Sequence, residues 1–457
     1  MPPLIPPPTL PMPVLVIVAA ASLVLLCTYL RRFDDLATRL ALFAVWLRYI
    51  MGAFHPITYP PNFGGLSLNA LASCGMIALL LASLNLRLLL LKNLMPIYAV
   101  LIVCVVSAVL NGQIGASINT LIKFAYLMAL TLALYHAFHR HGVRPIIRGL
   151  AIGVFVPVVY QWFSVGLGTG KAGESDGSIS FIGGYNHEAA FSVTLLTFLA
   201  VMVFFNETTK FRRFVYLAIG MFGLVVANYR TAILAALPPL AIFVSVVIVG
   251  SFVRKQRPIV FVGVLAMMAL TVPILITVLG ERFSDIGVTL DKGASLIKPP
   301  VYFTVEEKAL FSARAYIWSQ YLYEWLTARP KNILVGFGAD SWTDRFPLYA
   351  HNTFVSYAYE FGLAGLWAIL YLFWRNLRVA LAISGPMRPI CVSAIIGFFV
   401  LNLATMPFWL IEGNVLLAII LAYTWHAARV TAAARRVVLA RPVQVSPPIG
   451  VGARRMS

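Results

Sequence analysis

Long apolar runs separated by short polar connections make up most of this sequence. Windows of about twenty apolar residues with few charges have the length of a helix that crosses a bilayer. Such windows occur at 12–30, 36–54, 68–86, 94–110, 118–138, 147–165, 187–205, 213–227, 231–250, 258–279, 353–374, 389–407 and 413–428. The pattern predicts an all-α, polytopic membrane bundle of about thirteen transmembrane helices.

Composition supports the membrane class. Of the 457 residues, 60% are hydrophobic and only 11% are charged, which excludes an ordinary soluble domain. The formal charge of +19 comes from basic residues spread over many connections. We interpret them as topology signals and contacts with anionic lipids, so no nucleic-acid partner is expected. The four cysteines lie in or beside apolar runs without CxxC spacing, and predict neither a disulfide nor a metal site.

The basic residues also predict the orientation. Most of the 35 lysines and arginines follow every second span, and short basic connections stay in the cytoplasm. The N-terminus is therefore expected outside and the C-terminus in the cytoplasm. The domain prediction is a proline-rich external leader at 1–11, ten helices over 12–279, a large external loop at 280–350, three helices over 351–428 and a basic cytoplasmic tail at 429–457.

The loop at 280–350 is the largest polar segment. It holds eight of the sixteen acidic residues, balanced by lysines and arginines, as in a soluble subdomain. Apolar spacing predicts one helix from Val305 to Leu326, ending near Thr327 ahead of Pro330. Arg314 and Trp318 lie one turn apart on this helix, and His351 and Asn352 follow the loop.

A few polar residues lie close to the predicted outer face. Arg48, in the second span, either belongs to a site or snorkels to the headgroups, and Lys123 is interpreted as snorkelling. Asn186 and His187 follow a Gly/Ser-rich loop, and Asn186 either contacts substrate or starts the next helix. Asp34-Asp35 is interpreted as a solvated cytoplasmic turn.

Arg230 occupies a very short connection, Asn228 to Thr231, which the alternation of basic loops places outside. It therefore has no topological role, and either binds helix C-terminal carbonyls or serves a site. Arg230, Arg314 and His351 flank one membrane face. Guanidinium groups suit phosphate oxygens, and a histidine with a pKa near about 6.5 can accept a proton from a hydroxyl.

Three motifs together resemble the bacterial O-antigen ligase and polysaccharide polymerase family. His351-Asn352, Gly362 and Gly365 form H-N-x9-G-x-x-G, and Arg230 with Leu234 forms R-x3-L. The segment before this histidine contains Arg314, then Trp318 four residues later, then Pro330, and then Gly-Phe-Gly at 336–338. Family ligases have twelve spans, so the first span here is extra. Glu360 is expected to pack or to dock the loop.

The resemblance implies an inverting, metal-independent glycosyltransferase without a cofactor. It would transfer glycan from undecaprenyl diphosphate to a sugar hydroxyl at the periplasmic face of the bacterial inner membrane. The acceptor is lipid A-core in a ligase, the expected function, and a lipid-linked glycan in a polymerase, the alternative. Arg230 and Arg314 would hold the diphosphate, and His351 would act as base or orient the acceptor. Other candidate substrate-binding residues are Asn352, Arg48, Asn186, His187 and Trp318.

A membrane transporter is the more distant alternative. Many helices with few buried charges fit that class as well. Transporters, however, usually contain internal repeats with paired broken helices, and the two halves of this sequence show no such repeat.

Overall fold

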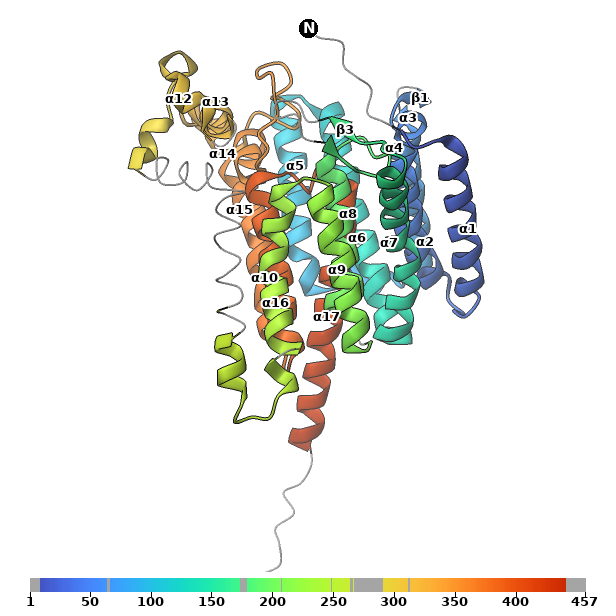
Figure 1. The fold of residues 1–457 in the computed structure, drawn as a ribbon. Coiled ribbons are helices and arrows are strands. Elements are labelled where there is room, and N and C mark those ends of the chain that lie inside the picture. The colour runs from blue at the N-terminus through green and yellow to red at the C-terminus, as the bar shows by residue number, and fades with distance from the viewer. Residues whose placement is uncertain are drawn as a thin grey trace, which may run out of the picture.

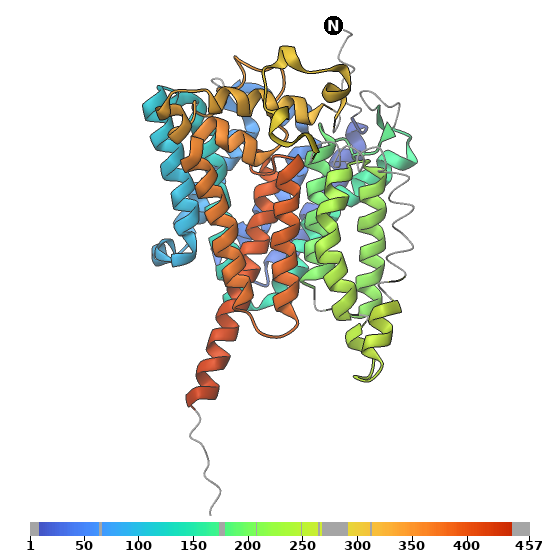
Figure 2. The same ribbon diagram turned by 90° about the vertical axis from the view of Figure 1, so that its left-hand side faces the viewer.

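The computed structural model describes residues 9–63, 66–172, 179–206, 208–247, 249–263, 266, 291–310 and 313–440. Its long helices run side by side in one bundle (Figures 1 and 2). They are α1 (Met12–Leu30), α2 (Leu36–Ala53), α4 (Leu68–Ser83), α5 (Met95–Asn111), α6 (Ile114–His141), α7 (Val143–Gly166), α8 (Glu188–Leu199), α9 (Lys210–Val226), α10 (Arg230–Val247), α15 (Thr353–Leu381), α16 (Met387–Ala404) and α17 (Ile411–Ala440).

Within these ranges nine helices are long and apolar enough to cross a membrane: α1, α2, α5 with the turn before it, α6, α7, α10, α15, α16 and α17. The predicted all-α membrane bundle is confirmed. The predicted spans at 68–86, 187–205 and 213–227 are helical as α4, α8 and α9, but with 16, 12 and 17 residues these helices are shorter than the nine. The span predicted at 258–279 lies mostly outside the described residues, so thirteen spans remain a prediction.

Short elements complete the bundle. Helix α3 (His55–Thr58) follows α2, and α8 continues into a π-helical turn at Ala200–Phe204. Two antiparallel ribbons lie in connections, one pairing β1 (Pro61–Phe63) with β2 (Leu66–Ser67) and the other pairing β3 (Lys171–Ala172) with β4 (Ile179–Ser180).

Helix α1 lies at the edge of the bundle (Figure 1). Only 17% of its apolar window is buried, whereas 72% is buried in α2 and in α6. It is attached to its neighbours by hydrogen bonds from Tyr29 Oη to the Pro145 carbonyl and from Trp46 Nε1 to Ser22 Oγ, both 2.9 Å long. Leu15 and Leu26 of α1 are nevertheless part of the buried core, so α1 packs as a peripheral helix, and its assignment as an extra span stays a prediction.

Three short helices, α12 (Val305–Ala309), α13 (Arg314–Leu326) and α14 (Pro330–Val335), lie at one end of the bundle (Figure 1). The prediction of one continuous helix from Val305 to Leu326 is wrong. Ala313 has φ +66°, a left-handed conformation that cannot continue a right-handed helix. The predicted end is confirmed, because Thr327 caps α13.

Close packing of α14 on α15 fixes this subdomain to the bundle. Gly362 breaks α15 with φ +68°, and a Cβ there would lie 2.4 Å from the Leu334 backbone. A Cβ at Gly336 would lie 2.2 Å from the Glu360 backbone. Glu360 accepts the backbone N–H of Gly338 on its carbonyl at 2.8 Å and that of Asp340 on its carboxylate at 3.1 Å. The loop-docking role expected for Glu360 is confirmed.

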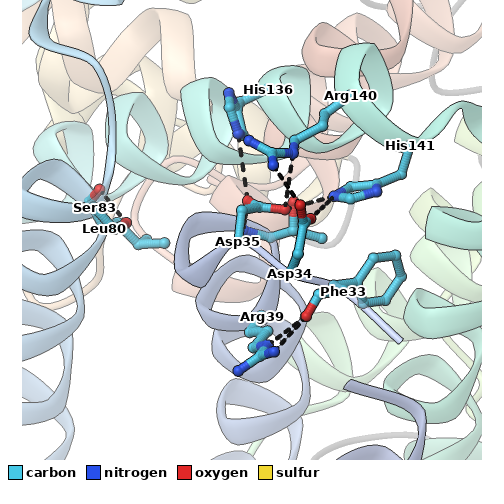
Figure 3. A network of polar contacts seen from close by, with 10 residues as sticks. Phe33, Asp34, Asp35, Arg39, Leu80, Ser83, His136, Arg140 and His141 are labelled. Atoms are coloured by element: carbon cyan, nitrogen blue, oxygen red, sulfur yellow. Dashed lines mark hydrogen bonds and ion pairs between the residues drawn. The ribbon is translucent and has the colours of Figure 1, made fainter. Parts of the chain in front are cut away.

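A charged network lies at the opposite end of the bundle, beside the α1–α2 connection (Figures 1 and 3). Asp35 caps α2 by accepting the Thr38 N–H at 2.8 Å, and His136 Nε2 lies 3.3 Å from its carboxylate. Arg140 and His141 pair with Asp34 and Asp35. Burial alone would raise the pKa of Asp35, but hydrogen bonds from His141 and Thr38 and the charge of His136 lower it to about 2.

The interpretation of Asp34-Asp35 as a solvated turn is therefore wrong for Asp35, whose side chain is only 11% exposed. Asp34, Asp35 and His141 each place a potential metal-ligating atom within 4.8 Å of the others. Arg140, His136 and His141 already contact the two carboxylates, and these contacts account for the geometry.

Candidate functional site

A cavity of about 300 Å³ lies where the loop subdomain meets the bundle. Five separate segments line it, with side chains from α6, the start of α8, the turn before α10, the loop before α15, and the connection between α16 and α17. They are Lys123, His187, Ala189, Tyr229, Asp340, Trp342, Tyr349, His351, Thr405, Met406, Trp409 and Leu410. Its volume is at the lower end of the range for small-molecule sites.

His351 lines this cavity directly ahead of α15. Its ring packs on Tyr349 with 3.9 Å between the ring centroids. Burial, together with the charges of Arg314 and His187, lowers the pKa of His351 to about 4. The imidazole is thus neutral near neutral pH. Arg314 and His187 thus each lie close enough to His351 to act on its charge.

Helix α13 holds the backbone that leads to His351. Trp318 Nε1 donates to the Ala350 carbonyl and Tyr321 Oη donates to the Leu348 carbonyl, both at 2.8 Å. Trp318 was predicted to bind substrate, but its indole N–H positions the segment before His351. A substrate contact through its ring stays a prediction.

Asn352, the second residue of the H-N pair, is buried and caps α15. Its Oδ1 accepts the N–H groups of Phe354 and Val355 at 2.9 and 3.2 Å, and its Nδ2 donates to the Leu403 carbonyl at 2.8 Å. Both polar atoms of the side chain are therefore used within the protein. The predicted substrate contact is untested, and the observed role is to orient the start of α15 beside His351.

Arg230 begins α10, one residue after Tyr229, which lines the cavity. In the described part of the chain its half-buried guanidinium makes no hydrogen bond or ion pair, and no bond to helix C-terminal carbonyls is found there. The phenol of Tyr229 pairs with Thr405 Oγ1. Burial raises the pKa of Tyr229, while the Thr405 hydrogen bond and the nearby Arg314 charge oppose that rise. Arg314 thus lies near both Tyr229 and His351.

Arg48 forms an ion pair inside the bundle. Its Nε lies 3.2 Å from Glu412 Oε1, and the two side chains are 6% and 2% exposed. Snorkelling to the headgroups is therefore wrong for Arg48. Its guanidinium is engaged inside the bundle and does not line the 300 Å³ cavity, and a role in substrate binding stays untested.

Asn186 is exposed, and it does not start α8. That role belongs to His187, whose Nδ1 accepts the Ala189 N–H at 3.0 Å. The alternative that Asn186 begins the helix is wrong, and its predicted substrate contact is untested. His187 lines the cavity and caps α8 at once.

Left-handed backbone conformations gather around the cavity. Among the described residues other than glycine, four have positive φ: Asn228, Ala313, Asp340 and His351. Asp340 and His351 line the cavity. Ala313 directly precedes Arg314, and Asn228 lies two residues before Arg230. Such conformations cost about 1 to 3 kcal/mol each and persist where the surroundings hold them, commonly at functional sites.

Sequence reasoning missed several residues of the cavity. Lys123, interpreted as snorkelling, lines it with Nζ 5.2 Å from the ring centre of Trp409. Asp340 was counted only among the charges of the loop. Trp342 and Trp409 were not singled out, and their buried indole N–H groups have no acceptor among the described residues. A lysine within an apolar span was the one available signal.

Neither a comparison with models of protein families nor one with curated protein sequences finds a match for this chain.

Proposed function

We propose that this protein is a membrane glycosyltransferase that moves glycan from an undecaprenyl-diphosphate carrier to a sugar hydroxyl, as an O-antigen ligase in lipopolysaccharide assembly. The observation that carries the proposal is that His187 and His351 line one cavity beside the bundle, with the charge of Arg314 close enough to lower the pKa of His351. The family motifs assign Arg314 to diphosphate binding and His351 to transfer, and His187 is a predicted substrate-binding residue.

The chemistry of the cavity suits such a reaction. Arg314 carries a planar guanidinium that can bind two phosphate oxygens, and Arg230 adjoins the cavity residue Tyr229. A diphosphate leaving group gains negative charge as its bond to the sugar breaks, so nearby cations stabilise the transition state. The aromatic side chains of Trp342, Tyr349 and Trp409 offer apolar faces to a sugar ring.

We place the cavity at the periplasmic face of the bacterial inner membrane, with the N-terminus outside and the C-terminus in the cytoplasm. The support is the alternation of basic connections, which assigns the end with the Asp35 network to the cytoplasm. The end with α12 to α14 is then outside, where a lipid-linked glycan would reach the cavity.

The test uses the purified full chain in liposomes without an ion gradient. Undecaprenyl-diphosphate-linked oligosaccharide is supplied with lipid A-core, and glycosylated lipid A-core is detected by gel mobility and mass spectrometry. Product is expected from the unsubstituted chain. His351→Ala should abolish it while retaining the binding of the donor lipid, because His351 is assigned to the acceptor side. No product from the unsubstituted chain with any acceptor would overturn the proposal.

A second acceptor separates ligase from polymerase. When lipid A-core is replaced by a second lipid-linked repeat unit, a ligase forms no longer chains, whereas a polymerase does. In cells, the chain should restore capped lipopolysaccharide in a ligase-deficient, polymerase-competent strain. Unchanged rough lipopolysaccharide would favour polymerase.

A further inference from the structure

Two side chains of opposite charge line the cavity. Lys123 enters from α6 and Asp340 from the loop. Within the described ranges, neither the ammonium nor the carboxylate makes a hydrogen bond or an ion pair, and no salt bridge within 4.0 Å joins them. Lys123 contacts the ring of Trp409, with 5.2 Å from Nζ to the ring centre. A charge inside a membrane bundle is costly unless a partner is supplied.

Hydrogen bonds hold the backbone of Asp340 in place. They do not involve its carboxylate, and Asp340 lines the cavity. Its N–H donates to Glu360 Oε2 at 3.1 Å, and its carbonyl accepts from the N–H and the hydroxyl of Thr343 at 3.1 and 2.8 Å. These bonds stabilise a left-handed conformation with φ +55°. Burial raises the pKa of Asp340, and the nearby Lys123 charge partly opposes this and favours the carboxylate.

The two charges together define what fits between them. A phosphate beside Lys123 would be repelled by Asp340, and a cation beside Asp340 would be repelled by Lys123. A hydroxyl suits both, because its oxygen accepts from the ammonium and its hydrogen is donated to the carboxylate. The neighbouring rings of Trp342 and Trp409 suit the carbon face of a sugar. His351, by contrast, lies near the guanidinium of Arg314, and its ring packs on Tyr349.

We propose that Asp340 is a further catalytic residue, which accepts the proton of the acceptor hydroxyl while Lys123 binds the oxygen of that hydroxyl. This inference rests on the proposed transferase function. In the step, the acceptor oxygen forms a bond to the anomeric carbon of the donor sugar. The bond from that carbon to the phosphate oxygen breaks, its electron pair leaves with the diphosphate, and the hydroxyl proton passes to the Asp340 carboxylate. His351 then orients the reactants.

Asp340→Asn is the first test, because asparagine has the same size and tolerates the left-handed backbone. The transfer rate at saturating substrates should fall about 100-fold or more, as for loss of a general base, with the KM for the donor lipid unchanged. Asp344→Asn is the matched control, an exposed carboxylate four residues further along the same segment, and should leave the rate unchanged. Lys123→Met should raise the KM for the acceptor.

Asp340→Gly provides an independent test, since glycine also adopts the observed φ and leaves space for a small carboxylate. Added formate should restore part of the rate of Asp340→Gly and have no effect on the unsubstituted chain. Transfer by Asp340→Asn within about threefold of the unsubstituted rate would overturn this proposal alone. Loss of donor binding in both variants, without rescue by formate, would make Asp340 structural and overturn it as well. If the unsubstituted chain forms no product, the proposed transferase function is overturned together with the role of Asp340.

Discussion

The protonation of His351 depends on the charges around it. Because burial, Arg314 and His187 disfavour the imidazolium, the folded chain takes up a proton there near pH 4, whereas an unfolded chain does so near about 6.5. Between these values the unfolded state binds more protons, so this residue makes stability rise with pH. At neutral pH a neutral imidazole next to Arg314 can accept a hydrogen bond without repelling the guanidinium.

Histidine NMR of the detergent-solubilised chain tests this. The sequence has seven histidines, and His351→Gln identifies the resonance that belongs to His351. Its titration midpoint is expected at about 4, and Arg314→Gln should raise it because one cation is removed. The midpoint should stay below about 6.5, since burial persists. A midpoint near about 6.5 in the unsubstituted chain would contradict the arrangement.

Substitutions of Arg230 distinguish bidentate phosphate binding from attraction by positive charge alone. Arg230→Lys keeps the charge but loses the planar fork, so transfer should fall nearly as far as in Arg230→Ala, with a loss of about 2 to 4 kcal/mol of transition-state stabilisation. Arg212→Lys, in the exposed first turn of α9, is a control that should leave transfer unchanged. Near-normal activity of Arg230→Lys in cells would show that only the charge matters.

Among the elements, those with a clear physical signature were predictable. A membrane span must be long and apolar, so α1, α2, α6 and α15 follow from the sequence pattern. The break before α13 was not predictable, because an alanine with positive φ leaves no signal in the sequence. The site was predictable in part. His351, from a family motif, and His187, from its place after the Gly/Ser-rich loop, both line the cavity, whereas the part played by Lys123 and Asp340 is visible only in the folded chain, where α6 meets the loop.

The close contact between α14 and α15 at Gly362 can be tested. Gly362→Ala forces a Cβ against the Leu334 backbone at a left-handed position, and should destabilise the chain by more than about 1 kcal/mol. Gly75→Ala in α4 is the matched control, because its added Cβ meets nothing within 4 Å. Thermal unfolding in detergent measures both. Equal midpoints for Gly362→Ala and the unsubstituted chain would mean that α14 is not held in this way.

Across the whole molecule, the Arg48–Glu412 ion pair connects α2 to α17 inside the bundle. Removing one charge leaves the other buried and unpaired, so Glu412→Gln should destabilise the chain by about 3 to 5 kcal/mol. The double variant Arg48→Met/Glu412→Leu should recover much of that loss. Glu324→Gln, which removes the partner of the exposed Arg345, should cost less than about 1 kcal/mol. A double variant as unstable as Glu412→Gln would contradict this account.

The distance of 364 residues between Arg48 and Glu412 also imposes an order in time. At about 5 to 20 residues per second, synthesis brings Glu412 out roughly 20 to 70 s after Arg48. During that interval α2 has no counter-ion, and we expect Arg48 to remain at the headgroups and move inward only when α17 arrives. A thiol at Leu47→Cys should then react with an impermeant maleimide in chains truncated before Glu412, and be protected in the full chain. The last step of assembly would thus bury Arg48, a residue that is synthesised early.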